Sequence, residues 1–286
     1  MKRKILVLGA NGMAGHVIIT HLRKMSEKFE VYSIARTYSE IHPTKLMDIS
    51  NFQELREYIY SIMPDVIVNC VGILNKMADE SQDLAILVNS YLPHFLKNLT
   101  KDLKLKVVHI STDCVFSGRE GNYTENSVKD GTGTYAQTKS LGEICNSKDL
   151  TIRTSIIGPE LNINGIGLFN WFMQQKGTIN GYKRAIWTGI TTIELAKATV
   201  AAIEQDLSGI YNLVNGSKIS KFDLLVLMNN TFVKSLTIKE NSEYAVDKSL
   251  VCTRENFDYV VPSYEEMVTE MKSWIDTHTG FYAHYL

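Results

Sequence analysis

The chain has 286 residues, of which 44% are hydrophobic and 21% charged, with a formal net charge of -1. This composition is typical of an ordered globular protein that is long enough for one large α/β domain and a smaller lobe. A charge near zero provides no basic field for nucleic acid, and no apolar stretch approaches the roughly 20 residues that span a bilayer, so we expect neither nucleic acid nor membrane as a partner.

The first expected strand, residues 4–8, is followed by a glycine-rich turn that leads into an expected helix at 14–25. Gly9, Gly12 and Gly15 suit a tight turn, the approach of a pyrophosphate to backbone amides, and close packing of the helix on a sheet. Asn11 and Met13 lie in the same turn. A turn of this kind can also be purely structural, so its place between a strand and a helix is what favours a dinucleotide site.

A second strand is expected at 29–35 and is followed at once by Arg36. An NAD site usually places an acid here for the ribose hydroxyls, whereas an NADP site places an arginine. Arg36 therefore favours NADPH, with NADH as the alternative. A solvated charge at a strand end would have the same sequence pattern.

Further Val- and Ile-rich runs alternate with amphipathic helical patterns, as in βαβ units. We expect helices at 52–62, 83–99 and 135–145, and strands at 66–69, 107–111 and 150–153. The alternation predicts an α/β fold with a Rossmann-type doubly wound parallel sheet, in a domain that covers residues 1–155.

Two hydroxyls, Ser111 and Thr112, stand at the end of the fourth of these strands, where they could face the ligand cleft or cap a turn. Tyr135 and Lys139 follow 23 residues after Thr112, and their spacing of four places both on one face of a helix. An ammonium beside a phenol favours the tyrosinate, so we expect Lys139 to lower the pKa of Tyr135 and to let it exchange a proton with a carbonyl oxygen.

After residue 155 the alternation weakens, and residues 156–187 are rich in glycine with scattered aromatics. We expect a smaller α/β lobe that binds substrate over residues 156–286, with helices at 221–230 and 264–277. An expected helix at 191–205 and a strand at 209–214 predict that the chain returns to the first domain around 190–215.

Together these motifs resemble the extended short-chain dehydrogenase/reductase family, in particular the dTDP-4-dehydrorhamnose reductase branch, which reduces nucleotide-linked 4-keto-6-deoxy sugars. The resemblance implies that Thr112, Tyr135 and Lys139 are catalytic, with the proton coming from Tyr135. The further cofactor contacts that it and the motifs imply are Asp48, Ile49, Cys70, Val71, Gly72, Asn89, Ser111, Lys139, Thr154 and Ser155. The substrate residues expected are Asp113, Cys114, Ile156 and Trp187.

Two departures from this family bear on the substrate: Cys114 and Ile156 replace aromatic residues that typically line the sugar site. Losing such a wall reshapes the pocket, so the class of substrate is predicted but the sugar and its nucleotide are not. A bifunctional epimerase/reductase that uses Cys114 is an alternative, although no histidine lies between Arg153 and Trp187 to act as its partner. A non-catalytic NADP-binding regulatory protein is another, because fold does not fix function.

The four cysteines are widely spaced and show neither zinc-ligand spacing nor a Cys-x-x-Cys pair. This indicates reduced thiols, no metal site and a cytoplasmic location. A homodimer is the commonest assembly of such proteins and is a further expectation.

Overall fold

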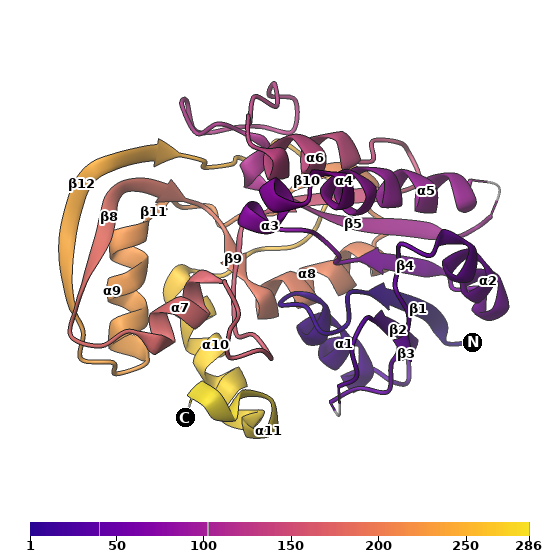
Figure 1. The fold of residues 1–286 in the computed structure, drawn as a ribbon, viewed down its shortest axis with the longest axis horizontal. Helices are drawn as coiled ribbons and strands as arrows, with labels where there is room; N and C mark the ends of the chain where they lie inside the picture. Colours follow the sequence, from indigo (N-terminus) through magenta and orange to yellow (C-terminus); the bar gives the residue numbers. More distant parts are fainter. Residues whose placement is uncertain (40, 102, 286) are drawn as a thin grey trace.

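A seven-stranded parallel sheet forms the centre of the protein, which we describe from a computed structural model covering residues 1–39, 41–101 and 103–285 (Figure 1). In chain order its strands are β1 (Arg3–Leu8), β2 (Phe29–Ala35), β3 (Lys45–Leu46), β4 (Val66–Asn69), β5 (Lys106–Thr112), β6 (Leu150–Thr154) and β10 (Gly209–Asn212). Their order across the sheet is β10-β6-β5-β4-β1-β2-β3. The expected α/β class with a Rossmann-type sheet is confirmed.

Each central strand is buried on both sides, because alternate residues point into two separate cores. In β1, Ile5 and Val7 enter one core, whereas Leu6 and Leu8 enter the other. The first core also holds side chains of α1 (Gly15–Lys24) and α8 (Thr192–Glu204), and the second those of α2 (Phe52–Ile62) and α5 (Leu92–Leu99). Figure 1 shows α5 and α6 (Thr134–Gly142) on the opposite side of the sheet from α1 and α8.

The single helix expected over 83–99 is interrupted. The structure has α3 (Asn75–Glu80), α4 (Gln82–Ala85), a π-helical turn η1 (Ile86–Tyr91) and then α5. Pro93 lies in the first turn of α5 and has no N–H to bond the carbonyl of Asn89, which explains the change of helix type. The π-helical turn η1 packs closely against α6. A Cβ on Gly142 of α6 would lie 1.9 Å from the carbonyl oxygen of Asn89.

A smaller lobe is built on a three-stranded sheet in the order β11-β8-β12, drawn at the left of Figure 1. Its strands are β8 (Thr178–Trp187), β11 (Ile219–Ser220) and β12 (Thr237–Asp247), with α9 (Lys221–Thr231) packed against β8. The remaining elements are η2 (Asp113–Val115), β7 (Ile156–Ile157), α7 (Leu168–Gln174), β9 (Ile190–Thr191), α10 (Tyr264–Thr277), α11 (Thr279–Tyr282) and η3 (Ala283–Tyr285). We did not expect β8 and β12 as strands.

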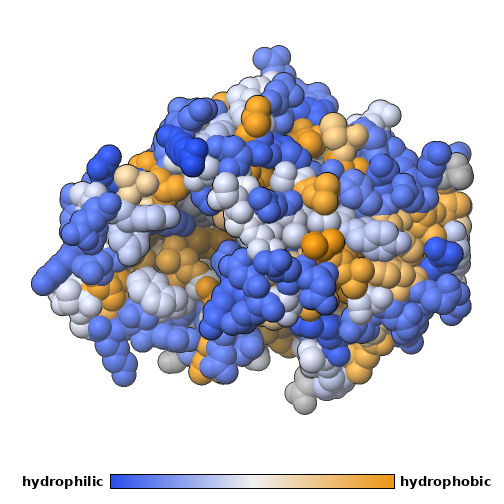
Figure 2. Space-filling view, turned by 45° about the horizontal axis from the view of Figure 1, so that its top comes forward, coloured by the Kyte–Doolittle hydropathy of each residue, from blue (hydrophilic) through white to orange (hydrophobic). Residues whose placement is uncertain are grey.

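The strand order reverses between β1 and β4, which makes the carboxyl ends of these strands the place where ligands bind in such sheets. Gly9 follows β1 and Cys70 follows β4, and a Cβ on Gly9 would lie 3.3 Å from the Cys70 carbonyl carbon. Figure 2 shows a hollow between the smaller lobe and the rest of the molecule, with hydrophobic side chains at its base. No helix in the described part of the chain is long and apolar enough to cross a membrane.

Candidate functional site

The glycine-rich turn has the geometry that its sequence predicts. Gly9 has a φ of +85°, and a Cβ on Gly15 would lie 2.1 Å from the carbonyl oxygen of Gly9. Gly12 is exposed, and a Cβ there would meet only that same oxygen, at 3.3 Å. The outer side of the turn is therefore open, and it leads directly to the amino end of α1, where backbone N–H groups favour an anion.

Two residues of the turn contact other segments. The side-chain amide of Asn11 donates to the carbonyl of Thr37 at 2.8 Å, which ties the turn to the segment after β2. The methyl end of Met13 lies beside Gly167 of the smaller lobe, because a Cβ on that glycine would come within 2.5 Å of it.

Arg36 and Asp48 lie on the same edge of the sheet, and both are exposed. The Asp48 carboxylate accepts hydrogen bonds from the backbone N–H of Ser50 at 2.9 Å and from its hydroxyl at 2.8 Å. These bonds lower the pKa of Asp48, and the charge of Arg36 acts in the same direction. The neighbouring Ile49 is buried.

Asn89 joins the loop after β4 to helix α6. Its side chain accepts from the N–H of Ile73 at 2.8 Å, donates to the carbonyl of Ile73 at 2.9 Å, and donates to the Thr138 hydroxyl at 3.0 Å. The loop itself contains Val71 and Gly72, which are partly buried. The structure thus gives Asn89 a bridging role beneath the expected cofactor wall.

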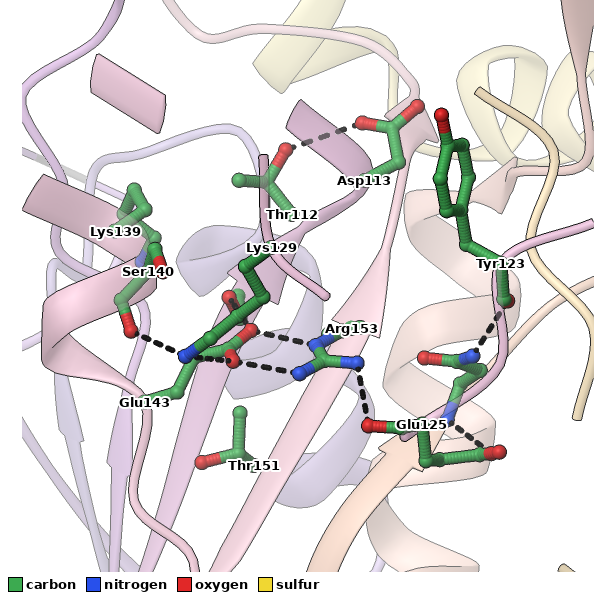
Figure 3. A network of polar contacts seen from close by, with 12 residues as sticks. Thr112, Asp113, Tyr123, Glu125, Lys129, Lys139, Ser140, Glu143, Thr151 and Arg153 are labelled. Atoms are coloured by element: carbon green, nitrogen blue, oxygen red, sulfur yellow. Dashed lines mark hydrogen bonds and ion pairs between the residues drawn. The ribbon is translucent and has the colours of Figure 1, made fainter. Parts of the chain in front are cut away.

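Thr112 ends strand β5 at the same sheet edge and Asp113 begins η2 directly after it, and each is 7% exposed. The Thr112 hydroxyl accepts from the N–H of Cys114 at 3.1 Å, as a helix cap does, and donates to Asp113 at 3.1 Å (Figure 3). Burial raises the pKa of Asp113, which the charges of Lys248 and Lys221 oppose.

Tyr135 and Lys139 lie one turn apart on α6, as their spacing predicts. Lys139 is 3% exposed, and its Nζ donates to the carbonyl of Ile110 at 2.7 Å. Burial lowers the pKa of Lys139 to about 8.

The expected lowering of the Tyr135 pKa was wrong. Burial raises this pKa, and the nearby Cys114 and Asp113 add to the rise, whereas the Thr112 hydroxyl opposes it. Desolvation of the phenol is the largest cause, and the Lys139 side chain is bonded to the main chain of β5. Tyr135 is therefore a phenol at neutral pH, the form that can give up a proton.

A buried ion pair, not expected from the sequence, lies beside these groups. Arg153 on β6 is 1% exposed and holds Glu143, just after α6, through bonds of 2.7 and 2.8 Å (Figure 3). Ser111 on β5 donates to the same carboxylate at 2.8 Å, and Lys129 lies 3.1 Å from it. The Ser111 side chain thus serves this network, and the carboxylate connects α6, β5 and β6.

Thr154 is the last residue of β6 and Ser155 joins β6 to β7, and the buried Thr154 hydroxyl donates to the Ser155 carbonyl at 3.3 Å. Ile156, the next residue, is partly buried. These positions lie at the end of β6, at the same sheet edge as Thr112, with which Thr154 pairs.

Trp187 is 2% exposed, and its indole N–H has no partner among the described residues. The Nζ of Lys221 lies 4.7 Å from the centre of its ring. Lys221 is the first residue of α9, where a cation opposes the helix dipole, and its charge acts on Asp113 and Cys114. Lys221 was not expected from the sequence, although an unfavourable lysine after the Ser220 cap was a usable signal.

Cys114 faces Lys248 as well as Asp113. Burial raises the pKa of this thiol to about 11, and the Asp113 charge adds to the effect, while Lys248 opposes it. Within the described residues, no group of three or more His, Cys, Asp or Glu side chains is arranged to hold a metal ion.

Known proteins similar to this chain include sugar reductases. Residues 3–248 match the family model described as RmlD substrate binding domain. The dTDP-4-keto-6-deoxy-D-glucose reductase of Streptomyces niveus is 26% identical over 231 residues, 78% of this chain and 77% of that protein. The dTDP-4-dehydrorhamnose reductase of Salmonella typhimurium is 25% identical over 256 residues, 78% of this chain and 85% of that protein.

Solved structures are similar over nearly the whole chain. A hypothetical dTDP-4-dehydrorhamnose reductase from Sulfolobus tokodaii superposes with a TM-score of 0.78 at 26% identity, covering 93% of this chain and 98% of its own. The dTDP-4-dehydrorhamnose reductase of Bacillus anthracis, solved in complex with NADP, gives 0.81 at 23% identity, covering 96% and 100%.

A different kind of relative matches only half of the chain. The methionine adenosyltransferase 2 subunit beta of Xenopus laevis is 25% identical over 143 residues, which is 49% of this chain and 42% of that protein.

Proposed function

Because the chain belongs to the RmlD substrate binding domain family, we propose that it is an NAD(P)-dependent oxidoreductase that reduces the 4-keto group of a nucleotide-linked 6-deoxy sugar. The observation that carries this proposal is the meeting of Thr112, Tyr135 and Lys139 at the carboxyl edge of the sheet. A hydroxyl, a protonated phenol and a buried lysine are the groups that carbonyl reduction requires.

The glycine turn is the proposed cofactor site. Its outer side is open at Gly12, where a Cβ would meet only the Gly9 carbonyl oxygen, and the turn leads directly to the amino end of α1. Arg36 stands where it can meet a ribose 2′-phosphate, which favours NADPH over NADH. When bound, NADPH supplies the hydride that reduces the carbonyl carbon.

The residues of this chain supply the proton and hold the oxygen. Tyr135, kept as a phenol by burial, donates its proton to the oxygen of the former carbonyl. The Thr112 hydroxyl, already beside the phenol, hydrogen-bonds the same oxygen and stabilises its developing charge. Lys139 lies one turn away, and its positive charge stabilises the Tyr135 phenolate once the proton has left.

The smaller lobe supplies the proposed substrate side, formed by residues 156–286 apart from the return around 190–215. Lys221 faces Asp113 and Cys114 from this lobe, and no carboxylate of the described residues lies within ion-pairing distance of it. A nucleotide sugar carries a diphosphate, an anion that suits such a lysine. Trp187, Cys114 and Ile156 complete this side.

Epimerisation by Cys114 is less well supported than simple reduction. A thiol whose pKa is raised to about 11 is a poor base at neutral pH. The match to the methionine adenosyltransferase subunit covers only half of the chain and gives no ground to prefer the regulatory alternative. We further propose that the protein acts in the cytoplasm as a homodimer.

The experiment that tests the reaction is a panel of enzymatically made 4-keto-6-deoxy sugars on dTDP, UDP and GDP, each mixed with the protein and NADPH. Loss of NADPH absorbance with formation of the corresponding alcohol is the expected result for at least one of them. The matched control is the Tyr135→Phe variant. Absence of oxidation with every sugar would contradict the proposal.

A further inference from the structure

Behind Lys139, three buried side chains form a line of hydrogen bonds that ends on the main chain. The Nζ of Lys139 lies 3.3 Å from Nε2 of His109, and Nδ1 of His109 lies 3.2 Å from the side-chain nitrogen of Asn69. The amide oxygen of Asn69 accepts from the backbone N–H of Val71 at 3.2 Å. Asn69 and His109 pair directly across β4 and β5, and both are fully buried.

The main chain sets the polarity of this line. The N–H of Val71 can only donate, so the oxygen of Asn69 faces it and the NH₂ group of Asn69 faces His109. Nδ1 of His109 must then accept, which places the ring proton of the neutral imidazole on Nε2. Burial lowers the pKa of His109, so the ring carries a single proton.

We propose that Asn69 and His109 present an N–H to the side-chain nitrogen of Lys139 and thereby favour the neutral amine form of this lysine. An ammonium group has only donors, whereas an amine has a lone pair that accepts the His109 proton. The second contact of Lys139, the carbonyl of Ile110 at 2.7 Å, accepts an N–H from either form. His109 and Asn69 are therefore positioning residues that act through Lys139.

Other groups around Lys139 shift its pKa, some downward and some upward. Burial lowers its pKa to about 8, the same direction as the hydrogen-bond polarity. Glu143, after the end of α6, and Cys70, after β4, oppose this change. Tyr135 lies one turn earlier on the same helix.

Resting on the proposed function, the arrangement has a consequence for catalysis. For a Lys139 ammonium to donate to Nε2 of His109, the ring proton must move to Nδ1. The Asn69 amide must then rotate so that its oxygen faces His109, which leaves the Val71 N–H without its acceptor. The charge beside Tyr135 is thus coupled to the loop that forms the proposed cofactor wall. With its pKa lowered to about 8, Lys139 holds its third proton at neutral pH but releases it more readily than an ordinary lysine does. The ammonium can therefore return a proton to the Tyr135 phenolate, and the neutral amine that remains is the form that Asn69 and His109 favour.

The direct test is long-range ¹H–¹⁵N NMR of the histidine side chains in the full chain, which identifies the tautomer without any catalysis. The His109 signals are assigned by their loss in His109→Gln, with the other six histidines as internal references. A proton on Nε2 near pH 9, above the Lys139 pKa, is expected. A proton on Nδ1 at that pH, or a doubly protonated ring, would overturn the inference while leaving the proposed function untouched.

A second test reverses the direction of these hydrogen bonds by changing Asn69. In Asn69→Asp the carboxylate accepts from both the Val71 N–H and Nδ1–H of His109. Nε2 of His109 then becomes an acceptor that favours the ammonium form of Lys139. The alkaline limb of the kcat–pH profile should therefore move up by about one pH unit. In Asn69→Asp combined with His109→Phe the charge remains but the ring is gone, and most of the shift should disappear. An equal shift in the double variant would show that the carboxylate acts directly, against the proposal. Should the double variant not fold, the tautomer measurement decides.

Discussion

Arg153 holds Glu143 with two parallel hydrogen bonds, Nε to Oε1 at 2.7 Å and Nη2 to Oε2 at 2.8 Å. The pair joins β6 to the residue that follows α6, and Ser111 on β5 bonds the same carboxylate. Burial opposes the charge on Glu143, but its bonds to Arg153 and the charges of Arg153 and Lys129 outweigh this and lower its pKa. The helix that carries Tyr135 is thereby fixed to the strand that carries Thr112.

The Glu143→Gln variant should lose about 3 kcal/mol of unfolding free energy at neutral pH, because it leaves the buried Arg153 without a counter-charge. Urea unfolding measures this loss. The depressed pKa of Glu143 means that the advantage of the wild type is present above pH 4.5 and is lost as the pH falls through the lower, folded-state pKa.

Glu120→Gln is the control for this change, since Glu120 is exposed and its side chain makes no hydrogen bond or ion pair among the described residues. Equal stability losses in the two variants at neutral pH would show that the ion pair does not hold the site together.

Gly15→Ala should destabilise the protein by roughly 1–3 kcal/mol and weaken NADPH binding, because its Cβ would lie 2.1 Å from the Gly9 carbonyl. Thermal unfolding and a fluorescence titration with NADPH measure the two effects. Gly280→Ala is the matched control, as no atom lies within 4 Å of the Cβ position there. Unchanged NADPH binding in Gly15→Ala would argue against the turn as the cofactor site.

The central sheet was predictable because its strands are short apolar runs buried on both faces, such as Val66–Asn69. Strand β12 was not, because most of its residues, from Thr237 to Asp247, are polar and exposed and show no alternation. The break in the expected helix over 83–99 depends on Pro93 and on the close contact of Asn89 with α6.

Within the site, the glycine turn and the spacing of Tyr135 and Lys139 were visible in the sequence because they are local. The pairing of Glu143 with Arg153 brings together residues ten positions apart on different elements, and spacing alone does not show it. The same holds for His109, which looked like part of an apolar strand. The direction of the Tyr135 pKa was misjudged because the burial of the phenol, the largest cause of the rise, is not readable from spacing.

Lys221→Met should raise the KM for the nucleotide sugar about tenfold with a smaller change in kcat, because a charged hydrogen bond to the substrate is lost. Steady-state kinetics at saturating NADPH measure both constants. Lys272→Met removes a partly exposed lysine that pairs with Asp276 on α10 and should change neither constant. An unaltered KM in Lys221→Met would remove this residue from the substrate site.

Reduction should proceed without exchange at ring carbons, because Cys114 stays a thiol at neutral pH. Product formed in D₂O with NADPH should therefore carry no solvent deuterium on the ring, and Cys114→Ser should still reduce the ketone. Mass spectrometry and NMR of the product give the answer. Deuterium in the ring that disappears in Cys114→Ser would instead support the epimerase/reductase.

Single-turnover kinetics of Tyr135→Phe test most directly whether Tyr135 is the proton donor. With an accepted keto sugar and NADPH in place, the rate of reduction should fall by about 100-fold or more, while the Kd for NADPH stays that of the wild type. Reduction at the wild-type rate in Tyr135→Phe would show that Tyr135 is not the proton donor.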